Sequence, residues 1–503
     1  MNVSQFFEHW KITENPFRGE EARHDGVFQR LADSSSGLPP TALHSDFEKI
    51  LGQLSRPSSA IVFGEKGSGK TAMRLLIARE INRHNERRPD ERVMLIAYDD
   101  LSGKLDRLHA AVGGKPLEAL QTLQLSDHLD AILSLASTRL TTELLDGPRA
   151  GEWHRALRKG DGALARDASL LQATYDAHEM ASTRSGRLWS ALKIKPKGPM
   201  RVWRLAAMLG WIVPAMVVVG FYTLGGQQGN QAWSIAFGIA MAAWLIALGK
   251  RLLWDRLMAS RLAKRLARQL RLVERQPESW ATSLDRLMPE DRKPSILPLT
   301  SSDEQRYAML TRLMRVTRAI GYRGVLVVVD RVDEPTIVNG DAERMRAVIW
   351  PMLSNKFLQQ EGLGVKMLLP VDLRYALFKE SSAFFQEARL DKQSLIERLT
   401  WTGAMLYDLC NARLAACREP GAEPVTLLEL FAEDVTRQDV VDALDQMHQP
   451  RDAFKFLYRC LSEHCAGVTA DQQAWRIPRL VLEQARRAEV ERLQQLYRGI
   501  RPA

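Results

Sequence analysis

Eight residues near the start of the chain have the types and the spacing of a phosphate-binding loop. Residues 64–71 read Gly-Glu-Lys-Gly-Ser-Gly-Lys-Thr, which is the complete pattern G-x-x-x-x-G-K-[ST]. The glycines of such a loop let several backbone N–H groups and the start of a helix face one anion. We expect Lys70 to reach the β- and γ-phosphates of a nucleotide and Thr71 to ligate Mg²⁺. The alternative is a degenerate loop with a structural role only.

A buried strand and a helix must position this loop. The apolar residues 60–63 predict the strand, and residues 72–82 predict the helix. Residues 93–98 predict a second buried strand. The residues predicted to bind the nucleotide phosphates are Gly64, Gly67, Ser68, Gly69, Lys70, Thr71 and Ala72.

Two later strands are each followed by an acidic residue. Residues 324–329 are apolar and rich in valine, and Asp330 comes next, which predicts a central strand of a parallel sheet. Residues 364–371 predict a further strand, and Asp372 follows it. Ligands of open α/β sheets bind at the carboxyl ends of the strands. We therefore expect Asp330 to help hold Mg²⁺ together with Thr71.

A hydrolase needs another carboxylate to orient the attacking water. The candidates are Asp333 and Glu334, which follow Asp330 closely. If the strand register is shifted, these two acids form the metal-and-base pair and Asp330 is a bystander. A third reading is a solvated turn before Pro335.

Two apolar stretches in the middle of the chain have the length of membrane spans. Residues 205–224 and 232–249 carry no charge, and about 20 helical residues cross a hydrocarbon core ~30 Å thick. The uncharged residues 225–231 join them. This pattern predicts a transmembrane hairpin, and the alternative is a pair of buried core helices.

Basic residues flank both ends of the predicted hairpin. Between Lys193 and Arg275 the chain has fourteen Lys and Arg but two acidic residues, while the whole chain carries +10. The high charge therefore belongs to the membrane flanks and is poor evidence for nucleic-acid binding. Because positive flanks stay in the cytoplasm, we expect a multi-pass membrane protein with cytoplasmic N- and C-terminal parts. Residues 251–275 predict a basic helix that lies on the inner leaflet, continues the second span or packs against protein.

The cysteines and the N-terminus exclude other classes. Residues 1–10 lack the apolar core of a signal peptide, and the four cysteines form no C-x-x-C pair. We expect buried free thiols in a reducing compartment. A zinc site with His464 or His448 is the alternative.

The chain resembles two related classes of P-loop ATPase. The Asn-Pro-Phe turn at 15–17, the strand at 60–63 and the helical C-terminal part resemble AAA+/STAND-like ATPases of the origin-recognition and secretion-ATPase type. The hairpin between the two nucleotide motifs resembles the KAP family. KAP proteins usually have Asp-Asp-Leu-Asp-Arg at the second motif, where residues 330–334 here read Asp-Arg-Val-Asp-Glu.

The resemblance implies ATP and Mg²⁺ as cofactors and further site residues. Asp372 corresponds to a sensor of the γ-phosphate, and Arg451 to the sensor arginine of a helical lid. Arg389 and Arg398 stand where an arginine finger for a neighbouring subunit often originates. A homo-oligomer or a partner protein is implied with them. Each arginine has the alternative of an ordinary surface residue.

The predicted fold is α/β, a P-loop NTPase parallel sheet with a helical lid and a helical insertion that carries the hairpin. The first half of the core covers residues 1–103, the insertion 104–300, the second half 301–394 and the lid 395–503.

The predicted function is a membrane-anchored Mg-ATP-binding ATPase. It would couple binding or hydrolysis to conformational change or assembly at the cytoplasmic face of the membrane. The resemblance suggests the bacterial inner membrane as its location, with a role in bacterial signalling or phage defence. One alternative is a nucleotide switch that hardly hydrolyses. Another is a membrane-tethered DNA-acting ATPase, which is weakly supported because residues 475–501 lack an aromatic and basic stacking pattern.

Overall fold

The chain forms two compact units, each described here by itself. The computed structural model describes residues 1–19, 21–33, 39–159, 162–194, 199–223, 230–469, 472 and 474–497. Unit 1 comprises Met1–Asp99, Leu326–Arg346 and Leu353–Ala503, and unit 2 comprises Asp100–Val325 and Ala347–Met352. Unit 2 contains the predicted insertion and extends beyond it, because helix α16 (Asp303–Ala319) packs on the helices of the insertion.

Unit 1 is built on a five-stranded parallel sheet with strand order β2-β3-β4-β1-β5. The strands are β1 (Ala60–Gly64), β2 (Arg92–Tyr98), β3 (Tyr322–Val329), β4 (Leu363–Pro370) and β5 (Ser394–Ile396), and β3 crosses the unit boundary at Leu326. β1 pairs Gly64 with Pro370 of β4 and Ala60 with Ser394 of β5. Both β1 and β4 are buried along their whole length, as expected of strands covered on both faces. The predicted α/β class with a parallel sheet is confirmed.

Two local features interrupt the helices of unit 1. The predicted helical lid, residues 395–503, begins inside a strand, because β5 continues to Ile396; three residues are too few to show a period of two. The chain between Ala342 and Leu358 is broken at Pro351 into α17 (Ala342–Ile349) and α18 (Asn355–Leu358), because proline has no N–H to donate.

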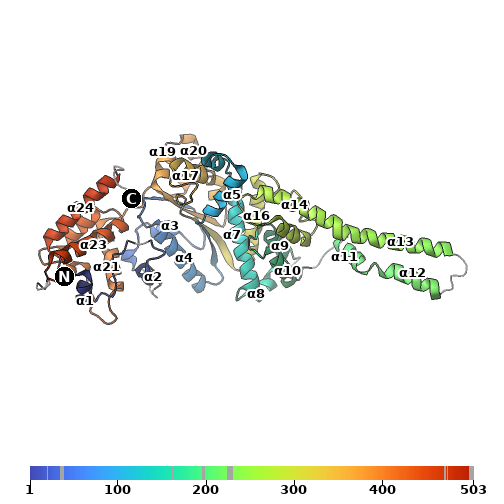
Figure 1. The fold of residues 1–503 in the computed structure, drawn as a ribbon, viewed down its shortest axis with the longest axis horizontal. Coiled ribbons are helices and arrows are strands. Elements are labelled where there is room, and N and C mark those ends of the chain that lie inside the picture. Colours follow the sequence, from blue (N-terminus) through green and yellow to red (C-terminus); the bar gives the residue numbers. More distant parts are fainter. Residues whose placement is uncertain are drawn as a thin grey trace. The chain divides into compact units, whose positions relative to one another are not determined.

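Helices from both ends of the chain share one core in unit 1. Phe6 and Val27 of the N-terminal helices are buried in the same cluster as Leu414 and Phe456, and α1 lies beside α23 in Figure 1. The helices of unit 1 are α1 (Val3–His9), α2 (Gly26–Asp33), α3 (Phe47–Leu51), α4 (Lys70–Arg87), α17, α18, α19 (Val371–Phe378), α20 (Ser382–Ala388), α21 (Gly403–Ala416), α22 (Arg437–Asp445), α23 (Pro450–Gly467) and α24 (Arg479–Tyr497), and α17 crosses the unit boundary.

A buried ion pair ties these two ends together. Arg413 of α21 donates to the Asp25 carboxylate at 2.7 Å and to the Pro16 carbonyl at 2.6 Å, and both charged side chains are at least 95% buried. The predicted turn at residues 15–17 therefore serves as an acceptor for the C-terminal helices. Breaking a buried pair of this kind leaves one charge without compensation.

Unit 2 is helical and buries several arginine–carboxylate pairs. Its helices are α5 (Ser102–Val112), α6 (Pro116–Gln121), α7 (Leu125–Asp146), α8 (Ala150–Leu157), α9 (Ala163–Tyr175), α10 (Ala181–Ala191), α11 (Pro199–Leu209), α12 (Ile212–Thr223), α13 (Asn230–Gly249), α14 (Asp255–Gln269), α15 (Pro277–Arg286) and α16. Arg306 donates to Asp130 at 2.8 and 3.0 Å, and Tyr175 donates to the same carboxylate at 2.9 Å. These three side chains are fully buried and pair with one another.

Two helices of unit 2 are long and apolar enough to cross a membrane. They are Leu205–Thr223 and Gln231–Gly249, and 6% of the residues in each are buried. A core helix of a soluble protein would be mostly buried, so the alternative of a buried pair of helices is not supported by the exposed fraction. Residues 224–229 of the predicted connecting loop lie outside the described residues, and Asn230 already belongs to α13.

The first span contains a break that the sequence explains. α11 ends at Leu209 and α12 starts at Ile212. Pro214 has no N–H for the carbonyl of Gly210 four residues earlier, and Val213 donates to that carbonyl at 3.3 Å instead. The second span has no such break. α13 continues through a π-helical segment, Lys250–Trp254, into α14, so that both form one long helix (Figure 1).

Candidate functional site

The glycine-rich loop leaves β1 and ends in α4, as its sequence predicts. Gly67 and Gly69 have φ values of 100° and 94°, which residues with a Cβ atom rarely adopt. Gly69 is the residue before α4, so the free N–H groups of the first helical turn adjoin the loop. The loop is therefore shaped to receive an anion at a helix N-terminus.

Lys70 folds back over the loop. Its ammonium donates to the carbonyls of Gly64 at 2.8 Å and Glu65 at 2.9 Å. Burial lowers the pKa of the Lys70 ammonium, and the carboxylates of Asp333 and Asp330 raise it in part. The amine thus lies among backbone acceptors with two acidic side chains near enough to influence it.

A cavity of about 520 Å³ in unit 1 joins residues that are far apart in sequence. This volume is within the range of small-molecule sites, roughly 300–1,000 Å³. Its lining includes Lys70, Thr71, Asp330 and Arg451. The predicted residues that line the cavity are Gly67, Gly69, Lys70, Thr71, Ala72, Asp330, Asp333, Glu334 and Arg451.

Asp330 follows β3 directly and is 1% exposed. Burial raises the pKa of its carboxyl to about 6, and the Arg74 guanidinium opposes that rise. Arg74 Nε lies 3.4 Å from Asp330 Oδ2, and that oxygen accepts no hydrogen bond within the described part of the chain. A buried acceptor without a hydrogen bond is uncommon in a folded protein, so apart from its contact with Arg74 this oxygen can still accept a ligand.

The residue after Asp330 has an unusual backbone. Arg331 has φ 62°, which is uncommon for a residue other than glycine. Its guanidinium donates to Glu334 at 2.5 Å. Glu334 therefore lines the cavity but is held in an ion pair, whereas no ion pair is recorded for Asp333 among the described residues.

Side chains from the C-terminal half of unit 1 contact the loop. Trp401 Nε1 donates to the Ser68 carbonyl at 2.9 Å. Gln449, the residue before α23, donates to Glu65, and Arg398 forms an ion pair with the same carboxylate. Arg451 comes so near that a Cβ atom on Gly67 would lie 3.1 Å from its Cβ. Arg451 and the loop are therefore neighbours in the lining of the cavity.

Five predicted residues stand apart from the cavity lining, and three of them are charged. Asp372 is an exposed residue in the first turn of α19, two positions past the end of β4, although its charge still influences Lys70. Arg389 is exposed, has φ 50°, and lines a different hollow with Lys49. Arg398 is exposed and contacts Glu65 of its own chain. Finger roles for the two arginines stay predictions. Gly64 ends β1, and Ser68 is buried behind the loop.

The site residues fit a nucleotide with Mg²⁺. Asp330 Oδ2 is a buried atom without a hydrogen-bond partner in the described residues, and Asp330 lines the same cavity as Thr71 and Lys70. Across the described residues no group of three or more His, Cys, Asp or Glu is arranged to hold a metal ion. Mg²⁺ on a nucleotide needs fewer protein ligands, because phosphates and waters supply the others.

The zinc alternative gains no support. All four cysteines are buried and free, as predicted. Burial raises the pKa of the Cys417 thiol to about 11. His464 Nε2 pairs with the Ala474 carbonyl at 2.9 Å, so this imidazole already has a partner.

The sequence analysis missed an arginine–carboxylate network beside the loop. Arg74 contacts both Asp330 and Asp99, and Arg23 donates to Asp99 at 3.1 Å. Two signals could have identified it. Arg74 comes one helical turn after Lys70, and Asp99 follows the predicted strand 93–98 at the sheet edge where Asp330 lies.

Comparison with protein-family models, with curated proteins and with solved structures finds no match to this chain.

Proposed function

We propose that unit 1 binds ATP with Mg²⁺ and that unit 2 anchors the protein in a membrane. The observation that carries the first part is one cavity lined by Lys70, Thr71, Asp330 and Arg451, which come from three separate segments of the chain. The AAA+- and KAP-like assignment and the P-loop NTPase fold belong to this proposal. The motif, the strand ends and the cavity support it.

Each residue has a role that its position makes possible. The loop N–H groups and the start of α4 would hold the phosphates. Lys70 would exchange its two carbonyl acceptors for phosphate oxygens, and Arg451 would approach the nucleotide from α23. Thr71 and Asp330 would hold Mg²⁺, which neutralises phosphate charge when bound. To hold Mg²⁺, Asp330 would have to lose its contact with Arg74.

The second carboxylate determines whether the site hydrolyses ATP. Asp333 lines the cavity with no ion pair recorded among the described residues, which favours it for orienting water. Glu334 would have to leave Arg331 first. The ion pair between Arg331 and Glu334 favours a second function, a nucleotide switch with little turnover.

Membrane anchoring rests on the exposed apolar hairpin. Ile239 and Ile246 of α13 are 66% and 64% exposed, and Met208 and Met216 on the other span are 74% and 67% exposed. Large exposed apolar surfaces on a hairpin are unfavourable in water. A bilayer of the bacterial inner membrane would cover them, with both units on the cytoplasmic side.

Nucleotide binding can be tested with the purified full-length protein in detergent. Lys70→Ala should weaken binding of a fluorescent ATP analogue by roughly 10- to 100-fold, because a hydrogen bond to a charged group contributes about 1.5–3 kcal/mol. Lys379→Ala, an exposed lysine of the same unit, is the matched control and should bind like the wild type. Equal affinity of Lys70→Ala and the wild type would exclude the proposed site.

Turnover separates the ATPase from the switch. Phosphate release is measured for the wild type, for Asp333→Asn and for Glu334→Gln. If the wild type releases phosphate, the residue whose substitution slows the release is the one that orients water. Binding without release favours the switch. If the protein is a switch, the mass of its assembly in solution should differ between ADP and a non-hydrolysable ATP analogue. An identical mass with both nucleotides would count against the switch.

A further inference from the structure

A polar cavity lies beside the helix that follows the second membrane span. It has a volume of about 790 Å³ and is bounded by α10, α14 and α15 of unit 2. Each of the three helices contributes residues to the lining of this cavity. α14 contributes Arg256, Ser260 and Lys264 at intervals of four residues, which places them on one side of the helix.

The chemistry of the lining suits an anion. Arg256, Lys264 and Arg286 line the cavity, and none of the three is in a carboxylate ion pair recorded for the described residues. Ser190, Ser260 and Thr282 add hydroxyl groups. Two acids also line it, but Asp285 lies 3.8 Å from Arg292, which offsets its charge. Glu278 is the other acid, and it is exposed.

The position of the cavity along the α13–α14 helix points to lipid. Exposed apolar residues on this helix continue past Gly249 to Leu253, Trp254, Leu257 and Met258. The span Gln231–Gly249 has 19 residues, or about 28 Å of helix at 1.5 Å per residue, close to the ~30 Å hydrocarbon core. Arg256 follows about 10 Å further along, near the depth of the headgroups.

We propose that this cavity binds the phosphate-bearing headgroup of an anionic phospholipid. The acyl chains would lie along the exposed Leu253, Trp254 and Leu257, while Arg256 and Lys264 would contact the phosphate. Arg286 forms the floor, where it also donates to the Ser182 carbonyl. A Cβ atom on Gly186 would lie 3.3 Å from its guanidinium, so a glycine here keeps the floor open. The inference rests on the proposed membrane anchor and is independent of nucleotide binding.

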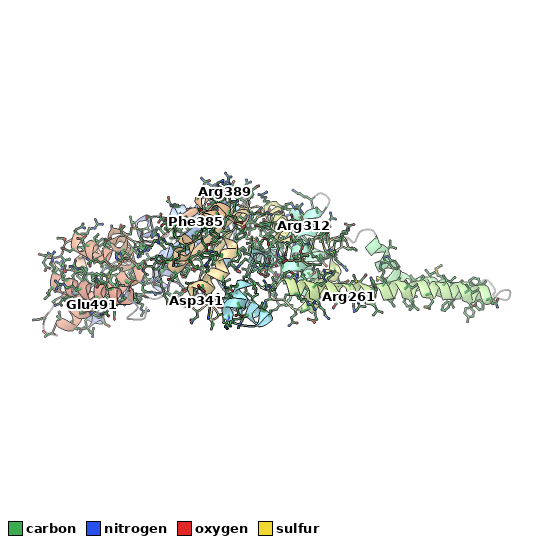
Figure 2. The ribbon with its side chains drawn as sticks, turned by 90° about the horizontal axis from the view of Figure 1, so that it is seen from above. Arg261, Arg312, Asp341, Phe385, Arg389 and Glu491 are labelled. Atoms are coloured by element: carbon green, nitrogen blue, oxygen red, sulfur yellow. The ribbon has the colours of Figure 1, made fainter. Side chains whose placement is uncertain are left out.

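The test compares two pairs of arginine and lysine substitutions that remove the same charge from α14. Arg256→Gln with Lys264→Gln removes the two cavity cations of α14 and leaves Arg286 in place. Arg261→Gln with Arg265→Gln removes two exposed cations of the same helix that are outside the lining (Arg261 is labelled in Figure 2). All four side chains are exposed, so both variants should fold.

Full-length protein is placed in nanodiscs of phosphatidylcholine mixed with phosphatidylglycerol and then released for native mass spectrometry. The wild type should retain phosphatidylglycerol selectively, and the cavity variant should lose this retention roughly tenfold more than the control pair, because each cation near the headgroups contributes to binding anionic lipid. Equal losses would mean general surface attraction and overturn the proposal. Displacement of the lipid by glycerol phosphate at equal concentration would also overturn it, in favour of a soluble anion.

Carbonate extraction of the membranes distinguishes the two levels of the proposal. A protein that resists extraction but retains no phosphatidylglycerol disproves the headgroup site alone. A protein that carbonate extracts disproves the membrane anchor itself.

Discussion

Two buried aspartates, one in each unit, have opposite surroundings. Asp130 of unit 2 accepts two hydrogen bonds from Arg306 and one from Tyr175. Asp330 of unit 1 is as deeply buried, but its Oδ2 accepts no hydrogen bond among the described residues, and its neighbour Arg74 is shared with Asp99. Burial raises the pKa of both carboxyls, and in unit 2 the Arg306 guanidinium opposes the rise most.

The difference separates a carboxylate whose hydrogen bonds are satisfied from one that, on our proposal, binds a ligand. A satisfied buried network rigidifies its surroundings, whereas an unsatisfied group is costly unless something binds it. Asp130, whose two oxygens both accept hydrogen bonds, lies between helices, and Asp330, whose Oδ2 accepts none among the described residues, lines a cavity. Four substitutions or conditions can break or sharpen this comparison.

The largest change in the free energy of unfolding is expected at the buried pair of Asp130 and Arg306. Asp130→Ala leaves Arg306 buried without its partner and should destabilise unit 2 by about 3–5 kcal/mol. Urea unfolding with hydrogen exchange on α7 measures this. The matched control is Asp146→Ala, which removes a half-exposed pair with Arg187 and should cost less than about 1 kcal/mol. Similar losses in both variants would contradict the contrast.

Acid should weaken the same helix. His128 is buried on α7, and burial lowers its pKa from 6.5 to about 4. The unfolded state therefore binds more protons between these values, so stability is complete above pH 6.5 and falls by about 3 kcal/mol as the pH drops to 4. His128→Gln should lack this loss of stability between pH 6.5 and pH 4. The free energy of unfolding of the wild type and of the variant, measured across pH, gives the difference. Parallel curves would refute it.

Asp330→Asn should leave the fold intact and remove the response to ligand. An excess of Mg-ATP at 100 times the dissociation constant stabilises a protein by about 2.7 kcal/mol, and the variant should gain little of this in a thermal melt. Without nucleotide its stability should match the wild type within about 1 kcal/mol. Asp391→Asn, an exposed aspartate of unit 1, should respond to Mg-ATP like the wild type.

The smallest effect concerns a buried cation of unit 1. Lys366 is in the middle of β4, is 0% exposed, and its Nζ has no hydrogen-bond partner among the described residues. Burial lowers its pKa to about 8. Lys366→Met should stabilise the protein by about 2 kcal/mol at pH 7, since the charged amine is disfavoured in the fold. The gain should shrink as the pH rises from 8 to 10.5, and Lys392→Met at the surface should show neither effect.

The sequence predicts the parts of the site that depend on local pattern. The glycine spacing of residues 64–71 identifies the loop, and the valine-rich strand before Asp330 identifies the sheet edge. Long-range pairing is not encoded in such patterns. Nothing near Trp401 in sequence reveals that it contacts the loop, because its partner Ser68 is 333 residues away. The three-residue strand β5 is missed because it is too short to show a period.

The shared core of α1, α2 and the C-terminal helices can form only late in the synthesis of the chain. Asp25 and its partner Arg413 are 388 residues apart, so the ribosome has made most of the chain before this contact can form. The hairpin at residues 205–249 emerges well before Arg451. On our proposal, a nascent chain therefore enters the bilayer while the wall that completes the nucleotide cavity has not yet been translated.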